Sequence, residues 1–155
     1  MSITTVQGDI FLTRAHTIAF GLNAAGRLGV TPAYTVLQDR YPVFVSDYRR
    51  HGRAESFTPG SLWLWRESTP WLAGLITNET LSGATRLRHV EGAMLQLYKE
   101  WERAGIRSLA IMRMGTDDEW PGVREVILHY AAQIALPITL YEAYLPGVAA
   151  EDTEG

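Results

Sequence analysis

The sequence predicts an α/β sandwich within a single domain, and three observations lead to that prediction. The chain has 155 residues, 46% of them apolar, which suits one domain with a substantial core and would be cramped for two. Short apolar stretches alternate with helix-length amphipathic segments, and turn residues separate them. No internal repeat or low-complexity segment interrupts this alternation. We therefore expect one domain over residues 1–145 and a small, acidic, disordered tail over residues 146–155.

Six strands are expected, with the fourth in a central position. Residues 71–76 read Trp-Leu-Ala-Gly-Leu-Ile, and an apolar run without polar alternation is typical of a strand covered on both faces. In the third strand Trp63 and Trp65 alternate with two leucines, so both indoles share one face, either under a helix or toward a partner. The expected strands are Ile3–Val6, Thr17–Leu22, Ser61–Trp65, Trp71–Thr77, Ser108–Met112 and Ile138–Ala143.

Four helices are expected between these strands. The longest covers residues 86–103, where apolar residues recur at spacings of three and four, and Gly105 is placed to end it. Another starts at Pro121, because proline is favoured in a first helical turn, and carries apolar residues as far as Ile134. Two shorter helices are expected at 32–40 and 42–50.

Composition excludes several classes of function. A formal charge of −3 and a pI near 5.8 give no general attraction to nucleic acid or to an anionic membrane, so a phosphate-bearing ligand needs a local site. The absence of cysteine excludes a disulfide framework, a thiolate nucleophile and a zinc–thiolate site. The four histidines show no metal-binding spacing, so neither a metal nor a cofactor is expected. Without a leader or a long apolar run, we expect a cytoplasmic protein without a membrane span.

Two short motifs near the N-terminus carry most of the functional signal. Gly8-Asp9-Ile10 is a small acidic turn after the first strand, and the stretch from Asn23 to Gly29 is a loop punctuated by glycine. Glycines let backbone N–H groups approach a phosphate closely, because no Cβ stands in the way and a positive φ costs little. The pair is therefore suited to hold an adenine at one point and a sugar phosphate at another.

In their order along the chain these motifs resemble the macrodomain family of ADP-ribose-binding modules. The resemblance also includes the strand Ile18–Gly21, the stretch Leu75-Ile76-Thr77 and the stretch Arg113-Met114-Gly115, so it covers nearly the whole chain. Within the family the sequence is most similar to the branch that contains the terminal ADP-ribose protein glycohydrolase and the bacterial antitoxin macrodomains that remove ADP-ribose from DNA. The resemblance implies a three-layer α/β/α domain with a mixed sheet of about six strands.

The resemblance also implies a role for each motif. Asp9 would accept a hydrogen bond from the adenine amino group while Ile10 offers its backbone N–H, although Asp9 is equally a common turn or cap residue. The loop from Asn23 would wrap the distal ribose, and a second loop from Met114 would flank the diphosphate. The ligand-binding residues expected on these grounds are Gly8, Asp9, Ile10, Asn23, Gly26, Arg27, Leu28, Gly29, Thr31, Thr77, Met114, Gly115 and Thr116.

The chain departs from the family pattern at positions that matter for diphosphate binding and for catalysis. Thr31 replaces a glycine of the first loop, and Pro32, which suits a helix start, removes one backbone N–H. In the second loop Asp118 is the counterpart of the family's catalytic aspartate, with N-terminal capping of the next helix as the alternative. Asn78 stands where the glycohydrolase branch carries a nucleophilic lysine, and an amide cannot attack the sugar.

Binding of ADP-ribose or of an ADP-ribosylated macromolecule is therefore the primary expectation. Hydrolysis of an ADP-ribosyl linkage by water, with Asp118 and Asn78 as catalytic residues, is a second hypothesis, so the sequence leaves open whether the protein is an enzyme. The alternative is a degenerate macrodomain that acts as a protein-interaction module through Trp63 and Trp65. The basic cluster at 47–53 is either a solvated face or a contact for the attached macromolecule. The sequence leaves the oligomeric state open.

Overall fold

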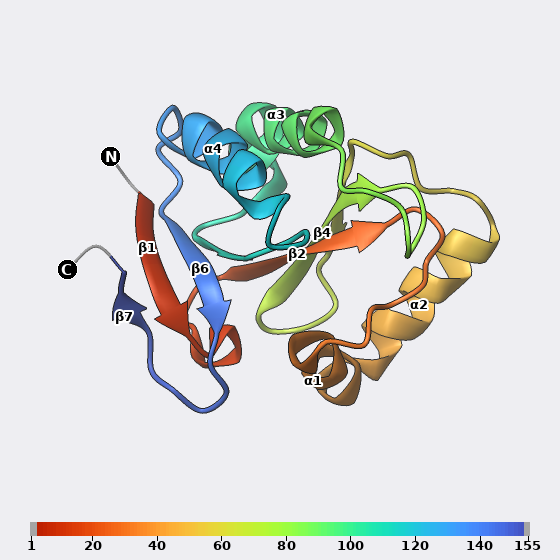
Figure 1. The fold of residues 1–155 in the computed structure, drawn as a ribbon, viewed down its shortest axis with the longest axis horizontal. Coiled ribbons are helices and arrows are strands. Elements are labelled where there is room, and N and C mark those ends of the chain that lie inside the picture. Colours follow the sequence, from red (N-terminus) through yellow and green to blue (C-terminus); the bar gives the residue numbers. More distant parts are fainter. Residues whose placement is uncertain (1–2, 154–155) are drawn as a thin grey trace.

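A seven-stranded mixed sheet forms the centre of the computed structural model, which describes residues 3–153 (Figure 1). The strands run in the order β3-β4-β2-β5-β6-β1-β7 across the sheet. Neighbours among β4, β2, β5, β6 and β1 are parallel, while β3 and β7 pair antiparallel at the two edges. The strands are β1 (Ile3–Gly8), β2 (Thr17–Asn23), β3 (Leu62–Trp65), β4 (Trp71–Asn78), β5 (Leu109–Met112), β6 (Ile138–Tyr144) and β7 (Glu151–Asp152).

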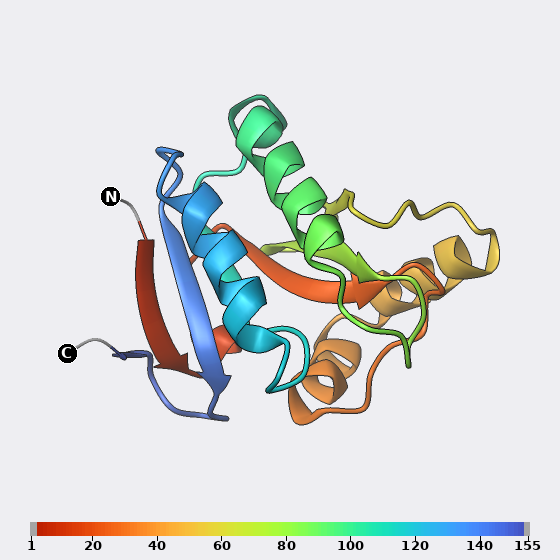
Figure 2. The same ribbon diagram turned by 45° about the horizontal axis from the view of Figure 1, so that its top comes forward.

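Helices cover both faces of this sheet, so the predicted three-layer α/β/α arrangement is confirmed. The first pair, α1 (Pro32–Arg40) and α2 (Pro42–Arg53), lies on one face, and the second pair, α3 (Leu87–Ala104) and α4 (Trp120–Ala131), lies on the other (Figure 2). Alternate residues of β2 serve the two layers: Phe20 packs in the core beneath α1 and α2, and Ala19 packs in the core beneath α3 and α4.

The ends of the helices follow the predicted signals. Proline occupies the first turn of α1, α2 and α4, and α3 stops at Gly105, which adopts a left-handed φ of 91°. The fourth helix is shorter than predicted, because it ends at Ala131 and leaves Ile134 beyond the turn that follows. None of the helices within 3–153 combines the length and the apolar character that crossing a membrane requires.

Parallel pairing brings the carboxyl ends of five strands to the same edge of the sheet. These ends are Gly8, Asn23, Asn78, Met112 and Tyr144. In open sheets of this kind, ligands bind outside the carboxyl ends of the strands. We therefore expect a ligand-binding site in the segments that follow β2, β4 and β5.

The C-terminal segment differs from the disordered tail that the sequence predicts. Residues 146–153 fold back along β1, where Val6 and Gln7 pair with Asp152 and Glu151 of β7. The hydroxyl group of Thr153 also bonds to the side chains of Thr5 and Glu142, at 2.8 and 2.9 Å. The open edge of β1 thus provides backbone partners that composition does not reveal. Residues 154 and 155 lie outside the described part of the chain.

The two indoles of β3 lie under a helix. Trp63 stacks on Phe44 of α2 with ring centroids 4.9 Å apart, and Trp65 meets the same ring edge-on at 5.7 Å. Both belong to the core beneath α1 and α2, as partly buried residues. The structure therefore decides between the two positions that the sequence left open for these residues, and it removes the exposed tryptophan face on which the interaction-module alternative depended.

Candidate functional site

A pocket of about 270 Å³ opens at the carboxyl ends of β2 and β4 and beside the segment after β5. Its size is close to the lower end of the range for small-molecule sites. The first loop (residues 23–29), the covering loop (residues 79–86) and the second loop (residues 114–119) surround it. The lining residues that the sequence predicted as site residues are Asn23, Arg27, Leu28, Gly29, Thr77, Asn78, Met114, Gly115 and Thr116.

The first loop is held closed by its own side chains and by α2. The amide group of Asn23 donates to the carbonyl of Arg27 at 2.7 Å and accepts the N–H of Arg27 at 3.2 Å. The buried hydroxyl group of Tyr48 accepts the N–H of Asn23 at 3.0 Å and donates to its carbonyl at 2.9 Å. Asn23 therefore determines the shape of the loop, and both the nitrogen and the oxygen of its side-chain amide already form hydrogen bonds within it.

The second loop is a reciprocal turn at the start of α4. The Thr116 hydroxyl group accepts the N–H of Glu119 at 3.2 Å, and a Glu119 carboxylate oxygen accepts the N–H of Thr116 at 2.8 Å. This is the geometry of a capping box, whose Thr-x-x-Glu signature is present in the sequence. Gly115 precedes the turn with a φ of +86°, which a residue with a side chain rarely adopts.

Hydrogen bonds join the covering loop to the end of β4 and to the second loop. The Asn78 amide oxygen accepts the hydroxyl groups of Thr77 at 2.7 Å and Thr85 at 3.1 Å, and its amide nitrogen donates to the carbonyl of Gly83 at 2.9 Å. The N–H of Thr85 donates to the second oxygen of Glu119 at 2.9 Å. Asn78 lines the pocket, but its side chain serves chiefly to fold this loop. Its predicted part in catalysis stays a prediction.

Three residues of the pocket lining have backbone N–H groups without a partner in the described part of the chain. Leu28, Gly29 and Gly115 line the pocket, and their N–H groups have no acceptor within residues 3–153. Arg27 is the one cationic residue in the lining and Glu119 the one carboxylate. Two backbone N–H groups, first that of Thr116 and then that of Thr85, outweigh burial and hold the pKa of Glu119 below its usual value. The carboxylate is therefore ionised at neutral pH, and each of its oxygens accepts one of these N–H groups.

Replacing Glu119 with glutamine tests this bracing role. A glutamine side chain offers one acceptor oxygen to two N–H donors, so we expect a loss of about 1–2 kcal/mol of unfolding free energy at neutral pH. The native carboxylate, with its lowered pKa, stabilises the fold above the unfolded value of 4.5, and that contribution is lost as the pH falls through the native pKa. Denaturant unfolding from pH 7 to pH 3 should therefore show the two proteins converging below about pH 4.5.

Glu125→Gln is the matched control, because this residue is exposed on the same helix. A Glu119→Gln protein whose stability tracked that of the control at every pH would refute the bracing role.

Gly8, Asp9 and Ile10 lie at the end of β1, away from the lining of the pocket. Asp9 is 6% exposed, and its two carboxylate oxygens accept the N–H groups of Phe11 at 2.9 Å and Gly147 at 2.8 Å. It therefore caps the short helical turn after β1 and anchors the C-terminal segment. A ligand amine could use only the acceptor capacity that remains on each oxygen.

Three other predicted residues also lie outside the pocket. Asp118 is exposed and absent from the lining, and Asp117 pairs with Arg113 at 2.7 Å. Capping of α4, the alternative role for Asp118, is wrong, because Thr116 and Glu119 make the reciprocal hydrogen bonds in the turn before the helix. Thr31 is exposed and precedes α1, in agreement with the predicted helix start at Pro32, and Gly26 lines a neighbouring hollow.

Sequence reasoning missed several residues of the lining. The ring of Tyr34 reaches the pocket from α1, with its hydroxyl group donating to the carbonyl of Gly21, and burial raises the pKa of Tyr34 above its usual value. Only the Thr-x-x-Glu pattern of the second loop offered a usable signal. The missed residues are Gly21, Leu22, Tyr34, Tyr48, Thr80, Leu81, Ser82, Gly83, Thr85 and Glu119. Within residues 3–153 no cluster of histidine and carboxylate side chains could hold a metal ion.

Comparison with curated proteins finds a distant relative, and no family model matches the sequence. The relative is a DNA ADP-ribosyl transferase–DNA ADP-ribosyl glycohydrolase fusion protein of Thermosipho africanus (strain H17ap60334). The two sequences are 21% identical over 161 residues, which cover 90% of this chain and 42% of the relative. The chain thus spans less than half of the relative it matches.

Solved structures share the fold much more clearly than the sequence. The macrodomain of Thermus aquaticus DarG matches with a TM-score of 0.81 at 16% identity, over 90% of this chain and 97% of that one. Thermosipho africanus DarTG in complex with ADP-ribose matches with a TM-score of 0.83 at 18% identity, over 96% of this chain and 43% of that one. The macrodomain of Mycobacterium tuberculosis DarG matches with a TM-score of 0.78 at 16% identity, over 94% and 98%. At these identities the likeness establishes the fold.

Proposed function

We propose that this chain, which has the macrodomain fold, binds ADP-ribose, with the ribose and diphosphate in the pocket. The observation that carries the proposal is the set of unpaired N–H groups at Leu28, Gly29 and Gly115, from two different loops of one pocket. A diphosphate supplies the acceptors that such donors lack, and Arg27 adds a positive charge. The complex of Thermosipho africanus DarTG with ADP-ribose supports the choice of ligand.

The adenine would lie toward the end of β1, where Asp9 and Ile10 are. In the sheet, β5 and β6 separate β2 from β1, so the two strand ends are about 14 Å apart. An extended ligand can follow the row of strand ends over such a distance. Adenine binding by Asp9 and Ile10 stays a prediction, as do hydrolysis by Asp118 and Asn78 and a cytoplasmic location.

Ser82→Glu tests where the diphosphate lies. Ser82 is an exposed residue of the covering loop that lines the pocket, and no hydrogen bond of its side chain holds the described structure together. A carboxylate here would repel the diphosphate by about 1–2 kcal/mol, so we expect calorimetry with ADP-ribose to show affinity about 5- to 30-fold below that of the unchanged protein.

Ser82→Gln is the matched control, since it adds similar bulk without charge. We expect its affinity to stay close to that of the unchanged protein. Equal losses in both variants would mean that bulk rather than charge blocks the ligand, and an unchanged protein that gives no heat with millimolar ADP-ribose would exclude the proposed function.

A further inference from the structure

The two halves of the covering loop are held to different degrees. Hydrogen bonds with Asn78 and Glu119 fix residues 83–85. Residues 79–82, which we call the lid segment, form hydrogen bonds only within the covering loop, as far as the described chain is concerned. Two residues of the lid segment line the pocket. The lid segment therefore lies over the pocket with little polar anchoring of its own.

A single polar contact joins the lid segment to the part of residues 3–153 outside the covering loop. The carboxylate of Glu79 lies 3.8 Å from Nε2 of His89, in the first turn of α3. This separation is too long for a hydrogen bond, and Nε2 of His89 is buried with no hydrogen-bond partner among residues 3–153. A shift of about 1 Å would bring the carboxylate to about 2.8 Å, the length of a charge-assisted hydrogen bond.

The surroundings of His89 make Glu79 its natural ionic partner. The turn before β3 packs the backbone of Gly60 against His89, and neither this turn nor β3 nor β4 carries a titratable side chain. The N-terminus of α3 disfavours a positive charge on His89, so a nearby carboxylate is needed to stabilise the imidazolium form. The other titratable side chains near it on α3 and on the neighbouring α4 are Arg86, Arg88, Glu91, Arg124, Glu125, His129 and Tyr130.

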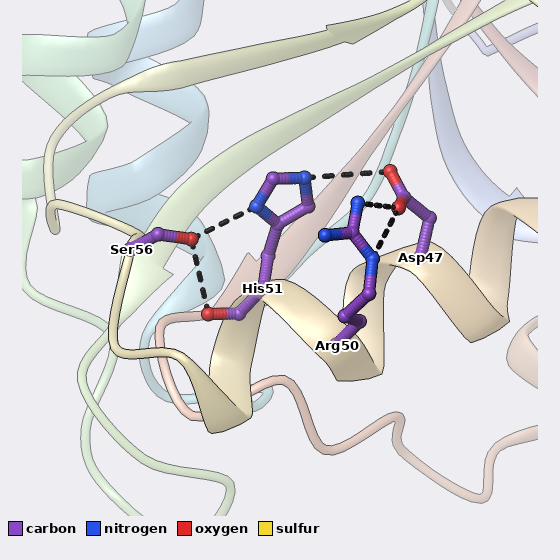
Figure 3. Close-up of polar contacts among 4 residues, drawn as sticks. All are labelled: Asp47, Arg50, His51 and Ser56. Atoms are coloured by element: carbon purple, nitrogen blue, oxygen red, sulfur yellow. Dashed lines mark hydrogen bonds and ion pairs between the residues drawn. The ribbon is translucent and has the colours of Figure 1, made fainter.

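Another histidine shows the contrast. His51 of α2 contacts Asp47 through Nε2 and bonds to Ser56 through Nδ1 at 2.8 Å, while Arg50 also binds Asp47 (Figure 3). Both ring nitrogens of His51 thus have partners within α2 and the turn after it. At His89, by contrast, a proton on Nε2 would create a donor that faces a carboxylate and has no competing acceptor among the described residues.

We propose that Glu79 and His89 form a proton-dependent latch that holds the lid segment over the pocket. Protonated His89 donates its Nε2–H to the Glu79 carboxylate, which fixes the lid segment. When His89 is neutral the contact weakens, and Leu81 and Ser82 of the pocket lining gain freedom to move. The latch is therefore engaged as the pH falls and released as it rises. That the molecule retained by the lid is ADP-ribose rests on the proposed function, whereas the latch itself does not.

A nitroxide label on the lid segment tests the latch without any ligand. The chain has no cysteine, so Ser82→Cys provides a single attachment site. By electron paramagnetic resonance, we expect label motion at least about twofold slower at about pH 5.5 than at about pH 8, the range in which an ordinary histidine changes its charge and a glutamate stays ionised. His89→Gln and Glu79→Gln should each remove this pH dependence. Because Glu79 is exposed, its replacement leaves the core intact.

His51→Gln is the matched control, because it removes a histidine that contacts a carboxylate away from the covering loop. The label on this variant should keep the full pH dependence. The latch would be refuted if label motion in the otherwise unchanged protein did not vary with pH. Persistence of the pH dependence in the Glu79→Gln protein, or its loss in the His51→Gln protein, would refute it as well.

The latch should also slow the release of ADP-ribose from the unlabelled protein. In stopped-flow measurements we expect a release rate at least about threefold lower at about pH 5.5 than at about pH 8, and no such difference in the Glu79→Gln protein. Equal rates at both pH values in the unchanged protein would overturn the role of the lid segment in retaining the ligand. A protein that binds no ADP-ribose would overturn the proposed function, while the nitroxide measurement would still decide the latch.

Discussion

Gly52→Ala is expected to destabilise the protein by about 3 kcal/mol. A Cβ atom on Gly52 would lie 2.3 Å from the carbonyl oxygen of Ala25 and 2.4 Å from the Cα atom of Gly26. Both are backbone atoms of the first loop, so no side-chain rotation can relieve the contact. The loop and α2 would have to move apart. Alanine is the better helix former by about 1 kcal/mol, which offsets only part of this cost.

The same substitution should weaken ADP-ribose binding by more than about tenfold, because the donors of Leu28 and Gly29 belong to the displaced loop. Denaturant unfolding and calorimetry, at a temperature where the variant is folded, measure the two effects.

Gly122→Ala is the control for helix propensity. A Cβ atom there would meet only the flexible end of Leu87, at 3.3 Å, so the change should be neutral or stabilising by up to about 1 kcal/mol. If Gly52→Ala were as stable as the control variant, the close approach of the first loop to α2 would not be required for stability.

The sequence predicts the framework well because the framework depends on periodic patterns. The apolar run at 71–76, the stripe along α3 and the left-handed Gly105 each reflect a local rule, and each predicted element is present. The first loop was predicted for a similar reason, because glycine after a strand end is a local signal, whereas the second loop was expected only from the resemblance to the macrodomain family.

The rest of the site depends on contacts between distant segments, which no local pattern encodes. Glu119 joins the second loop to Thr85, and Asp9 is occupied by the N–H of Gly147 from the far end of the chain. The resemblance to the macrodomain family made Asp118 the catalytic candidate, yet the structure exposes Asp118 and directs the neighbouring Glu119 to two backbone donors. The roles of adjacent carboxylates cannot be assigned before the conformation of the turn that carries them is known.

Tyr48→Phe is expected to cost about 2 kcal/mol, although it removes a single oxygen atom. Tyr48 is fully buried, and its hydroxyl group bonds to both the N–H and the carbonyl of Asn23. Phenylalanine keeps the ring contacts with Phe57 and Trp63 but leaves two buried backbone groups without a partner. Burial raises the pKa of Tyr48 to about 12, so the hydroxyl group remains a donor throughout the neutral range and the loss should not vary with pH there.

The effect should also extend to binding, because of where Asn23 lies. The register between β2 and β4 shifts between Leu22 and Asn23, and at this irregular end of the strand the Tyr48 hydroxyl group binds both the N–H and the carbonyl of Asn23. Without the Tyr48 hydroxyl group, Asn23 at the start of the first loop is no longer held in place. We therefore expect ADP-ribose affinity to fall by several-fold in calorimetry. Tyr98→Phe is the control, since Tyr98 is 42% exposed on α3 and its loss should change stability by less than about 0.5 kcal/mol. A Tyr48→Phe protein that lost stability but kept its full affinity would show that the loop is positioned by Asn23 and Arg27 alone.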